Sequence, residues 1–324
     1  MEATLIERTG IPFRTIPAAG LHGVGLRALP PNLVKMAQGV NASRQILGDF
    51  RPDVMMFTGG YVAFPMALAG WRIPSLVYVP DIEPGLALRT ISSLTHCVAV
   101  TTEDSKAFFS GKTGVVVSGY PVRPELMHIA REEALAAFRL DPDTPVLLVF
   151  GGSKGARSIN QAVIQHLEQV LALAQVIHIS GELDWPVVEK VKQGLDARIS
   201  ERYHAYPYLH EEMPLALAAA NLVISRAGAS VLGEFPMVGL PAILVPYPYA
   251  WRYQKLNAQY LADKGAAIVV QDEDLQAELL PAISSLLSEP ARLEAMENEM
   301  RSLARPQAAA IIALELERLG KGER

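Results

Sequence analysis

A glycine-rich turn at residues 151–155 carries the residues best suited to bind a phosphate group. Gly151, Gly152 and Ser153 follow the apolar run Val146–Phe150 and precede a helical stretch, with Gly155 closing the turn. Glycine admits a ligand close to the backbone, and free N–H groups at a helix N-terminus attract an anion. A hydroxyl beside them adds a further donor. The turn is therefore a candidate phosphate site, with a plain strand-to-helix turn as the alternative.

A second turn of the same kind lies in the segment Ile224–Leu240. Arg226 and Gly228 end a strand, and the helix that follows carries Glu234. A carboxylate can accept hydrogen bonds from both hydroxyls of a ribose, while the helix N-terminus holds a phosphate. Together the two turns predict a nucleoside-diphosphate site, although Glu234 taken alone would be typical of an exposed helix face.

A third group of polar residues follows the strand and proline-rich loop at residues 242–249. Gln254 and Asn257 lie three residues apart, on one face of the expected helix. Side-chain amides donate and accept at once, so they suit sugar hydroxyls. In the first half of the chain, Gly59 and Gly60, with Tyr61 beside them, and then Asp81 follow two other strands.

The elements that position these residues are short apolar strands alternating with helices, which is the pattern of parallel sheets covered on both faces. We expect an α/β fold of two doubly wound, Rossmann-like domains facing each other across a cleft. The first set of strands is expected at Phe13–Ile16, Val54–Thr58, Ser75–Val79, Cys97–Val100 and Val115–Ser118. The second set is expected at Val146–Phe150, Val176–Ile179, Tyr203–Ala205, Leu222–Ile224, Ala242–Val245 and Ala267–Val270.

The two prolines of the segment Tyr120–Pro124 mark the expected link between the domains. We expect a first domain at residues 1–122 and a second, ligand-binding domain at residues 123–304. The helix at about residues 305–324 is expected to return to the first domain. Ligands of such folds bind at the carboxyl ends of the strands, so the cleft is the expected site.

Composition excludes several classes of function. The net charge of −5 and the absence of a basic run argue against a nucleic-acid partner. No stretch reaches the ~18 to 20 apolar residues that span a bilayer. The chain is therefore expected to be soluble or peripheral to a membrane. Residues 62–74, which include Trp71 and Arg72, are the candidate membrane contact, with buried packing as the favoured alternative. The single cysteine, Cys97, is expected in the core, and no residue cluster suggests a metal or a cofactor.

At this point the motifs resemble those of the MurG-type glycosyltransferases. The resemblance runs along the whole chain and rests on TIPAAGL, GGYVAFP, GYPVR, GGSKGAR with Asn160, SRAGA with Glu234, GLPAILVPYP, and Gln254 with Asn257. It implies the GT-B architecture and an enzyme that transfers N-acetylglucosamine from UDP-GlcNAc to lipid I. The implied partners are UDP-GlcNAc, a lipid-linked acceptor and the cytoplasmic face of the cell membrane, where the protein would be peripheral.

The resemblance also implies residue roles. The turn at Gly151, Gly152 and Ser153 would meet the diphosphate, and Glu234 would hold the ribose. Arg123 would add positive charge, while Gln254 and Asn257 would lie at the sugar. The acceptor hydroxyl would attack the anomeric carbon with inversion and without an obligatory metal.

Two departures from the family pattern concern the acceptor side. The family segment HEQN is YVPD here, so Asp81 stands where asparagine is usual. The chain also lacks the family's opening GGTGGH loop, and with it a histidine proposed as general base. The expected sheet therefore lacks two strands and one helix, which a truncated gene model, a real loss or a second chain would explain. His22 is the nearest histidine, but nothing in the sequence places it near a sugar hydroxyl.

Two other functions remain open. The acceptor loops are the parts that deviate, so another lipid such as diacylglycerol is an alternative acceptor. An inactive UDP-sugar-binding remnant or subunit is the alternative from a different class.

Overall fold

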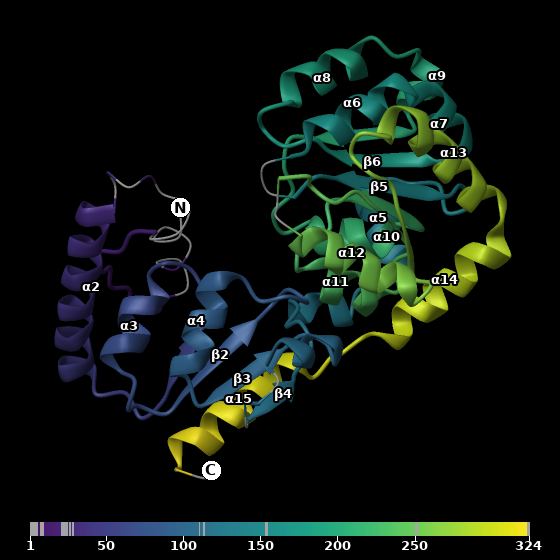
Figure 1. Ribbon diagram of the computed structural model, residues 1–324. Helices are drawn as coiled ribbons and strands as arrows, with labels where there is room; N and C mark the ends of the chain where they lie inside the picture. Colours follow the sequence, from purple (N-terminus) through teal and green to yellow (C-terminus); the bar gives the residue numbers. More distant parts are fainter. Residues whose placement is uncertain are drawn as a thin grey trace.

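The chain folds into two lobes, each built on a parallel β-sheet (Figure 1). The computed structural model describes residues 6, 10–20, 25, 27, 29–109, 111–112, 114–152, 155–249 and 252–322. Within this part of the chain no helix has the length and apolar character needed to cross a membrane.

The first sheet has the order β1-β2-β3-β4, and all of its neighbouring strands are parallel. Its strands are β1 (Met55–Phe57), β2 (Ser75–Val79), β3 (Cys97–Val100) and β4 (Val115–Val117). Its helices are α2 (Leu29–Phe50), α3 (Ala63–Ala69), α4 (Leu86–Leu94) and the 3-10 helix η2 (Asp104–Phe109). Alternate residues of β2 and β3 face opposite sides, so that Val77 and Val98 pack on the side of α3 and α4, while Leu76 and Ala99 pack on the other side.

The second sheet is larger, with the order β10-β9-β8-β5-β6-β7, and it is also parallel throughout. Its strands are β5 (Val146–Phe150), β6 (Gln175–Ile179), β7 (Tyr203–Tyr206), β8 (Leu222–Ser225), β9 (Ala242–Leu244) and β10 (Ala267–Val269). Val146 and Leu148 belong to one apolar cluster and Leu147 and Val149 to another. The sheet is therefore buried on both faces, as expected of a parallel sheet between helices.

The helices that surround the second sheet are α5 (Arg131–Phe138), α6 (Arg157–Gln165), α7 (Leu167–Leu173), α8 (Trp185–Gln193), α9 (Ala197–Ser200), α10 (Met213–Ala219), α11 (Val231–Val238), α12 (Tyr253–Asp263), α13 (Leu275–Ser288) and α14 (Pro290–Ser302), preceded by the 3-10 helix η3 (Pro124–Met127).

The last helix, α15 (Ala308–Gly320), crosses back to the first lobe (Figure 1). Its residues Ile312 and Leu319 pack against Leu76, Tyr78 and Cys97 of the first sheet. The two segments that join the lobes touch each other, since a Cβ on Gly119 would lie 2.4 Å from that of Arg305. Gly119 has a φ of +90°, which favours glycine.

One expected strand is wrong: residues 13–16 form no strand. The segment has an alternating pattern, but a strand also needs a neighbour to bond its backbone. The residues that follow lie against α2 instead, where Asn32 donates to the carbonyl of Gly20 at 2.7 Å and the carbonyl of Pro17 approaches Gly39. Among the described residues, β1 is consequently an edge strand of the first sheet, as β4 is at the other side.

Candidate functional site

The first glycine turn has a backbone that excludes side chains. A Cβ on Gly151 would lie 2.2 Å from the Ala156 nitrogen, and one on Gly155 would lie 2.2 Å from the Ser180 carbonyl oxygen. Gly152 has a φ of +85° and open space beside it. The N-cap residue of α6, Ala156, forms no side-chain cap hydrogen bond, so the first N–H groups of this helix lack that partner. Ser153, expected at the phosphate, lies outside the described residues.

The second turn lies beside the first, because β5 and β8 are neighbours and Phe150 pairs with Ser225. Parallel strands end at the same edge, so the residues that follow them share one place. Gly228 has open space around it, and α11 begins shortly after it with no side-chain cap. The structure thus brings two unblocked helix N-termini together.

Glu234 lies in the first turn of α11, with its side chain 17% exposed. Burial raises the pKa of this carboxyl, while a hydrogen bond from Ser230 and the charge of Arg123 partly oppose the shift. The Arg123 Nη2 atom lies 3.9 Å from Glu234 Oε1. The link segment between the lobes therefore supplies the cation beside this carboxylate.

Arg226 is held by protein groups. Its guanidinium binds Asp272 Oδ1 at 2.5 Å and Ser158 Oγ at 2.8 Å, and it lies 5.3 Å from the ring centre of Tyr247. The partners Asp272 and Ser158 could not be predicted from local patterns, because they are distant from Arg226 along the chain. Arg226 thus joins the second turn to the start of α6 and to the loop after β9.

The two amides of α12 have different surroundings. Asn257 is fully buried and its side chain binds Asp81, Ile82 and Ala227. Gln254 accepts a hydrogen bond from the Tyr247 nitrogen at 2.8 Å through its oxygen. Its amide nitrogen has no hydrogen-bond partner among the residues that the structure describes, which leaves that group available to a ligand.

The expected acceptor-side residues lie at the carboxyl ends of two adjacent strands, β1 and β2. Gly59 and Gly60 have φ values of +110° and +81°, and Tyr61 is exposed beside them. Burial raises the pKa of Asp81, and the hydrogen bond from Asn257 partly lowers it. These residues and α12 face each other where the lobes meet.

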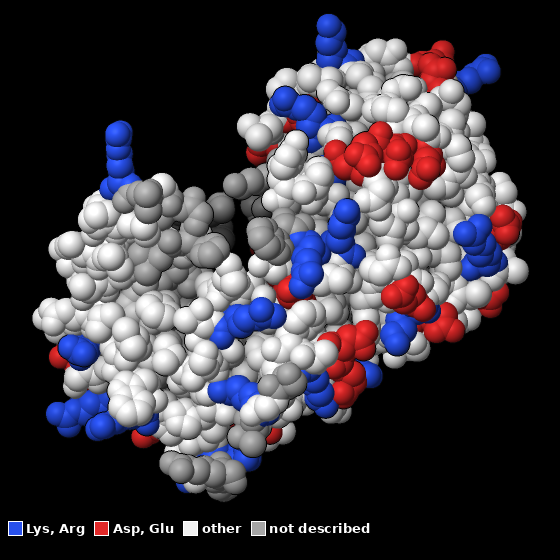
Figure 2. Space-filling view, viewed as in Figure 1, with Lys and Arg blue, Asp and Glu red and all other residues white. Residues whose placement is uncertain are grey.

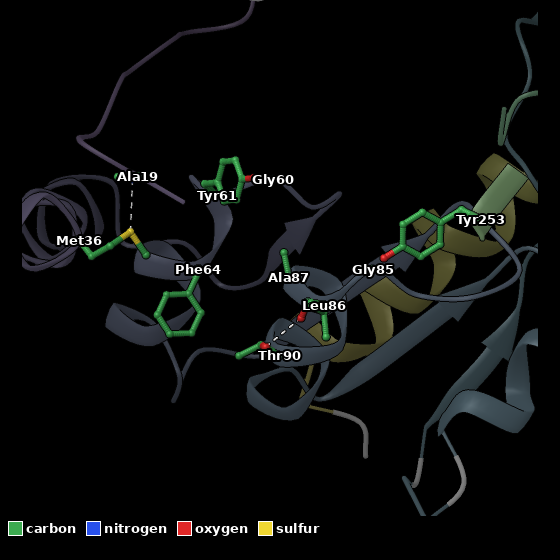
Figure 3. A pocket seen from close by; sticks show the side chains of 10 residues that line it. All are labelled: Ala19, Met36, Gly60, Tyr61, Phe64, Gly85, Leu86, Ala87, Thr90 and Tyr253. Atoms are coloured by element: carbon green, nitrogen blue, oxygen red, sulfur yellow. Dashed lines mark hydrogen bonds between the residues drawn. The ribbon is translucent and has the colours of Figure 1, made fainter. Parts of the chain in front are cut away.

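An apolar pocket of about 600 Å³ opens on this side (Figure 3). Met36 of α2 and Phe64 of α3 line one end, and Tyr253 of α12 lines the other. Its remaining lining residues are Ala19, Gly60, Tyr61, Gly85, Leu86, Ala87 and Thr90. A pocket of this character suits an apolar part of a substrate.

Two residues that the sequence did not single out as a pair join the lobes. Arg252, just before α12, forms a bidentate ion pair with Glu83, which follows β2. They are 169 positions apart, so no local sequence pattern predicts this ion pair. Among the described residues, no group of three or more His, Cys, Asp or Glu side chains is arranged to hold a metal ion.

Two parallel sheets whose carboxyl ends meet across the junction of two lobes define the GT-B class of architecture. The chain belongs to glycosyltransferase family 28. The model of the family's C-terminal domain matches residues 146–312, and that of its N-terminal domain matches residues 1–100.

Relatives and solved structures agree with this assignment. A Roseiflexus sp. (strain RS-1) protein is 39% identical over 98% of this chain and 81% of its own length, and one from Desulforudis audaxviator is 36% identical over 100% and 89%. Both are named UDP-N-acetylglucosamine--N-acetylmuramyl-(pentapeptide) pyrophosphoryl-undecaprenol N-acetylglucosamine transferase. The crystal structure of Acinetobacter baumannii MurG matches with a TM-score of 0.76 at 24% identity, covering 98% of this chain and 88% of that one. Neisseria meningitidis UDP-GlcNAc 2-epimerase, bound to UDP-GlcNAc, matches with a TM-score of 0.66 at 17% identity, covering 88% and 81%. The family and the fold class expected from the sequence are thereby confirmed.

Proposed function

We propose that this chain transfers N-acetylglucosamine from UDP-GlcNAc to N-acetylmuramyl-(pentapeptide) pyrophosphoryl-undecaprenol. The relatives that support this reaction are 36–39% identical and carry it in their names. The observation that carries the proposal is the juxtaposition of two open glycine turns with Glu234 at one sheet edge. That arrangement offers a diphosphate and a ribose separate partners.

In this assignment the diphosphate lies against Gly151, Gly152 and Gly228, beside helix N-termini whose N-cap residues form no side-chain cap hydrogen bond. The ribose hydroxyls donate to Glu234, and Arg123 adds positive charge beside it. The amide nitrogen of Gln254, which has no partner in the part of the chain that the structure describes, serves the sugar hydroxyls. Asn257 contributes indirectly, because its amide is already bonded on both sides.

The reaction is a single displacement at the anomeric carbon. The acceptor 4-hydroxyl forms the new C–O bond, the bond from C1 to the phosphate oxygen breaks, and the configuration inverts. Negative charge grows on the departing UDP, where the helix N–H groups and Arg123 stabilise it. The hydroxyl proton passes to a base that we leave unassigned; His22 lies outside the described residues.

The acceptor occupies the first lobe, near Gly59, Gly60, Tyr61 and Asp81. The helix α3 and its flanks bury Pro65 and Ala67 but leave Val62, Leu68 and Trp71 exposed. The guanidinium of Arg72 lies 4.7 Å from the ring centre of Trp71. Exposed apolar side chains with a cation beside them suit a membrane surface, so we place the protein peripherally at the cytoplasmic face of the membrane.

The test is transfer by the purified chain with UDP-GlcNAc and either the undecaprenyl-linked acceptor or diacylglycerol. We expect UDP release and a GlcNAc-bearing product only with the undecaprenyl-linked acceptor. Transfer to diacylglycerol alone would contradict the acceptor assignment. Binding of UDP-GlcNAc without transfer to either lipid would instead identify a donor-binding subunit.

A further inference from the structure

One side chain of the second lobe bonds to both lobes at once. Asn257 of α12 accepts a hydrogen bond from the Ile82 nitrogen at 3.1 Å and donates to Asp81 Oδ1 at 2.8 Å. It also donates to the Ala227 carbonyl at 3.1 Å. An asparagine amide has two N–H groups and one oxygen, so every polar atom is used. The loop after β2 and the turn after β8 are thus joined through a single buried amide.

A second contact joins the same loop to the start of the same helix. The side chain of Glu83 is 8% exposed, while that of Arg252 is 60% exposed, and the guanidinium binds both carboxylate oxygens. A buried carboxylate without its partner is strongly unfavourable, so Glu83 requires Arg252 in this position. Figure 2 shows basic side chains gathered near the junction of the lobes on this face.

The helix α12 also contacts residues of the proposed donor site. Gln254 lies in the first turn of α12 and accepts from the Tyr247 nitrogen at 2.8 Å. The ring of Tyr247 in turn packs on Arg226, which is bonded to Ser158 at the start of α6. A shift in the first turn of α12 would therefore displace Gln254. Through the contacts of Tyr247 and Arg226 it would also displace the loop after β9 and the second glycine turn.

We propose that Glu83 and Asp81, although they belong to the acceptor lobe, are positioning residues for the donor site. Glu83 holds the start of α12 through Arg252, and Asp81 holds its second turn through Asn257. The helix held at these two points presents Gln254 to the sugar. Neither touches the donor, so their effect passes through Arg252 and Asn257. This inference rests on the proposed function, because it takes the UDP-sugar to be the ligand beside α12.

The test is a double-mutant cycle with Glu83→Gln, Arg252→Gln and the double variant, with UDP-GlcNAc affinity measured by calorimetry in the absence of any acceptor. We expect each single change to weaken binding about tenfold and the double variant to be no weaker than either single one. Asp81→Asn keeps a hydrogen-bond acceptor and should bind as the wild type does, whereas Asp81→Leu should bind about tenfold more weakly. Neutralising the exposed pair Glu103 and Lys106 in the same way is the matched control and should change nothing.

A second measurement needs no nucleotide. Hydrogen exchange at the amide of Tyr247 and along α12 should be faster in Glu83→Gln than in the wild type, if Glu83 holds this helix. Unchanged exchange, or unchanged UDP-GlcNAc affinity in both single variants, would overturn the inference. Failure of the wild type to bind UDP-GlcNAc would refute the proposed function, and the exchange data would still decide whether Glu83 holds α12.

Discussion

Arg123 and Glu234 are far apart in the sequence, yet their side chains lie 3.9 Å apart. The carboxylate is largely buried at the N-terminus of α11, where it can accept both hydroxyls of a ribose. We expect Glu234→Gln to weaken UDP binding about tenfold to a hundredfold, because an amide oxygen replaces a charged acceptor pair. Calorimetry with UDP measures the change. The exposed Glu294 of α14 provides the control, since Glu294→Gln should leave the affinity unchanged.

The same pair predicts a pH dependence of donor binding. Burial raises the pKa of Glu234 above its ordinary value of 4.5, and Arg123 partly counters the rise. In the proposed site the ribose hydroxyls donate to the ionised form of Glu234, so UDP affinity should increase as the pH rises through this pKa and then stay level. In the variant Arg123→Gln this rise in UDP affinity should occur at higher pH, because the charge that lowers the pKa of Glu234 is gone. If the affinity of this variant rises at the same pH as that of the wild type, Arg123 does not act on this carboxyl.

His178 should make the protein less stable in mild acid. It is fully buried, with Nδ1 bonded to the Tyr203 hydroxyl at 2.7 Å and Nε2 to Asn160 Oδ1 at 2.9 Å. Burial lowers its pKa from 6.5 to about 4, against a small opposing effect of Asp184. Below pH 6.5 the unfolded chain binds a proton that the folded chain does not. The free energy of unfolding should therefore fall as the pH drops from 6.5 to 4, by up to about 3 kcal/mol, and His178 should have no such effect above pH 6.5.

Denaturant unfolding at a series of pH values measures this effect. The variant His178→Gln cannot take up the proton, so its stability should depend less steeply on pH than that of the wild type. Parallel curves for the two proteins would contradict the assignment of the slope to His178.

The first glycine turn predicts two different outcomes for one kind of substitution. Gly155→Ala forces a Cβ against the Ser180 carbonyl at positive φ, and should lower the free energy of unfolding by about 3 kcal/mol or more. Gly152→Ala meets open space and should cost about 1 kcal/mol of strain, while weakening UDP binding where the phosphate approaches the backbone. The control Gly265→Ala, also at positive φ, should show the strain without the loss of binding.

Chelation should leave transfer unchanged. In the proposed site the charge on the departing UDP is met by helix N–H groups and Arg123, which need no ion. The initial rate with excess EDTA measures this, and a loss of rate that Mg²⁺ restores would contradict it.

Vesicle binding should depend on the exposed face beside α3. We expect Trp71→Ser and Leu68→Ser to reduce sedimentation with anionic phospholipid vesicles severalfold, because each removes apolar area that would enter the interface. The exposed Leu183 of the other lobe is the matched control. If Leu183→Ser reduces sedimentation with vesicles to the same extent, the face beside α3 does not direct membrane binding.

The strands of both sheets could be predicted closely, because buried parallel strands are short apolar runs that stand out between helices. The ends of β2, β3 and β5 agree with the sequence prediction to the residue. The strand expected at residues 13–16 is wrong because pairing depends on a neighbour, which a local pattern does not report. The family and fold are confirmed, while the residue roles at the site stay predictions.

The contacts that arrange the site were harder to foresee. In the sequence Arg252 is a polar residue before a helix, and nothing near it indicates a partner. The ion pair with Glu83 forms only because the fold brings the two residues together. Asn257 was expected to face a sugar, and the structure surrounds it with Asp81, Ile82 and Ala227. Most partners of such side chains lie in the other lobe, so they cannot be predicted from the spacing of residues along the chain.

The packing of α15 on the first sheet has a consequence for synthesis on the ribosome. Leu76, Tyr78 and Cys97 are made before the second lobe, but the residues that cover them, Ile312 and Leu319, are made after it. The second lobe can complete its own sheet while this apolar face is still open to water. This face of the nascent first lobe must therefore stay uncovered, and exposed to chaperones or to aggregation, until α15 has been translated.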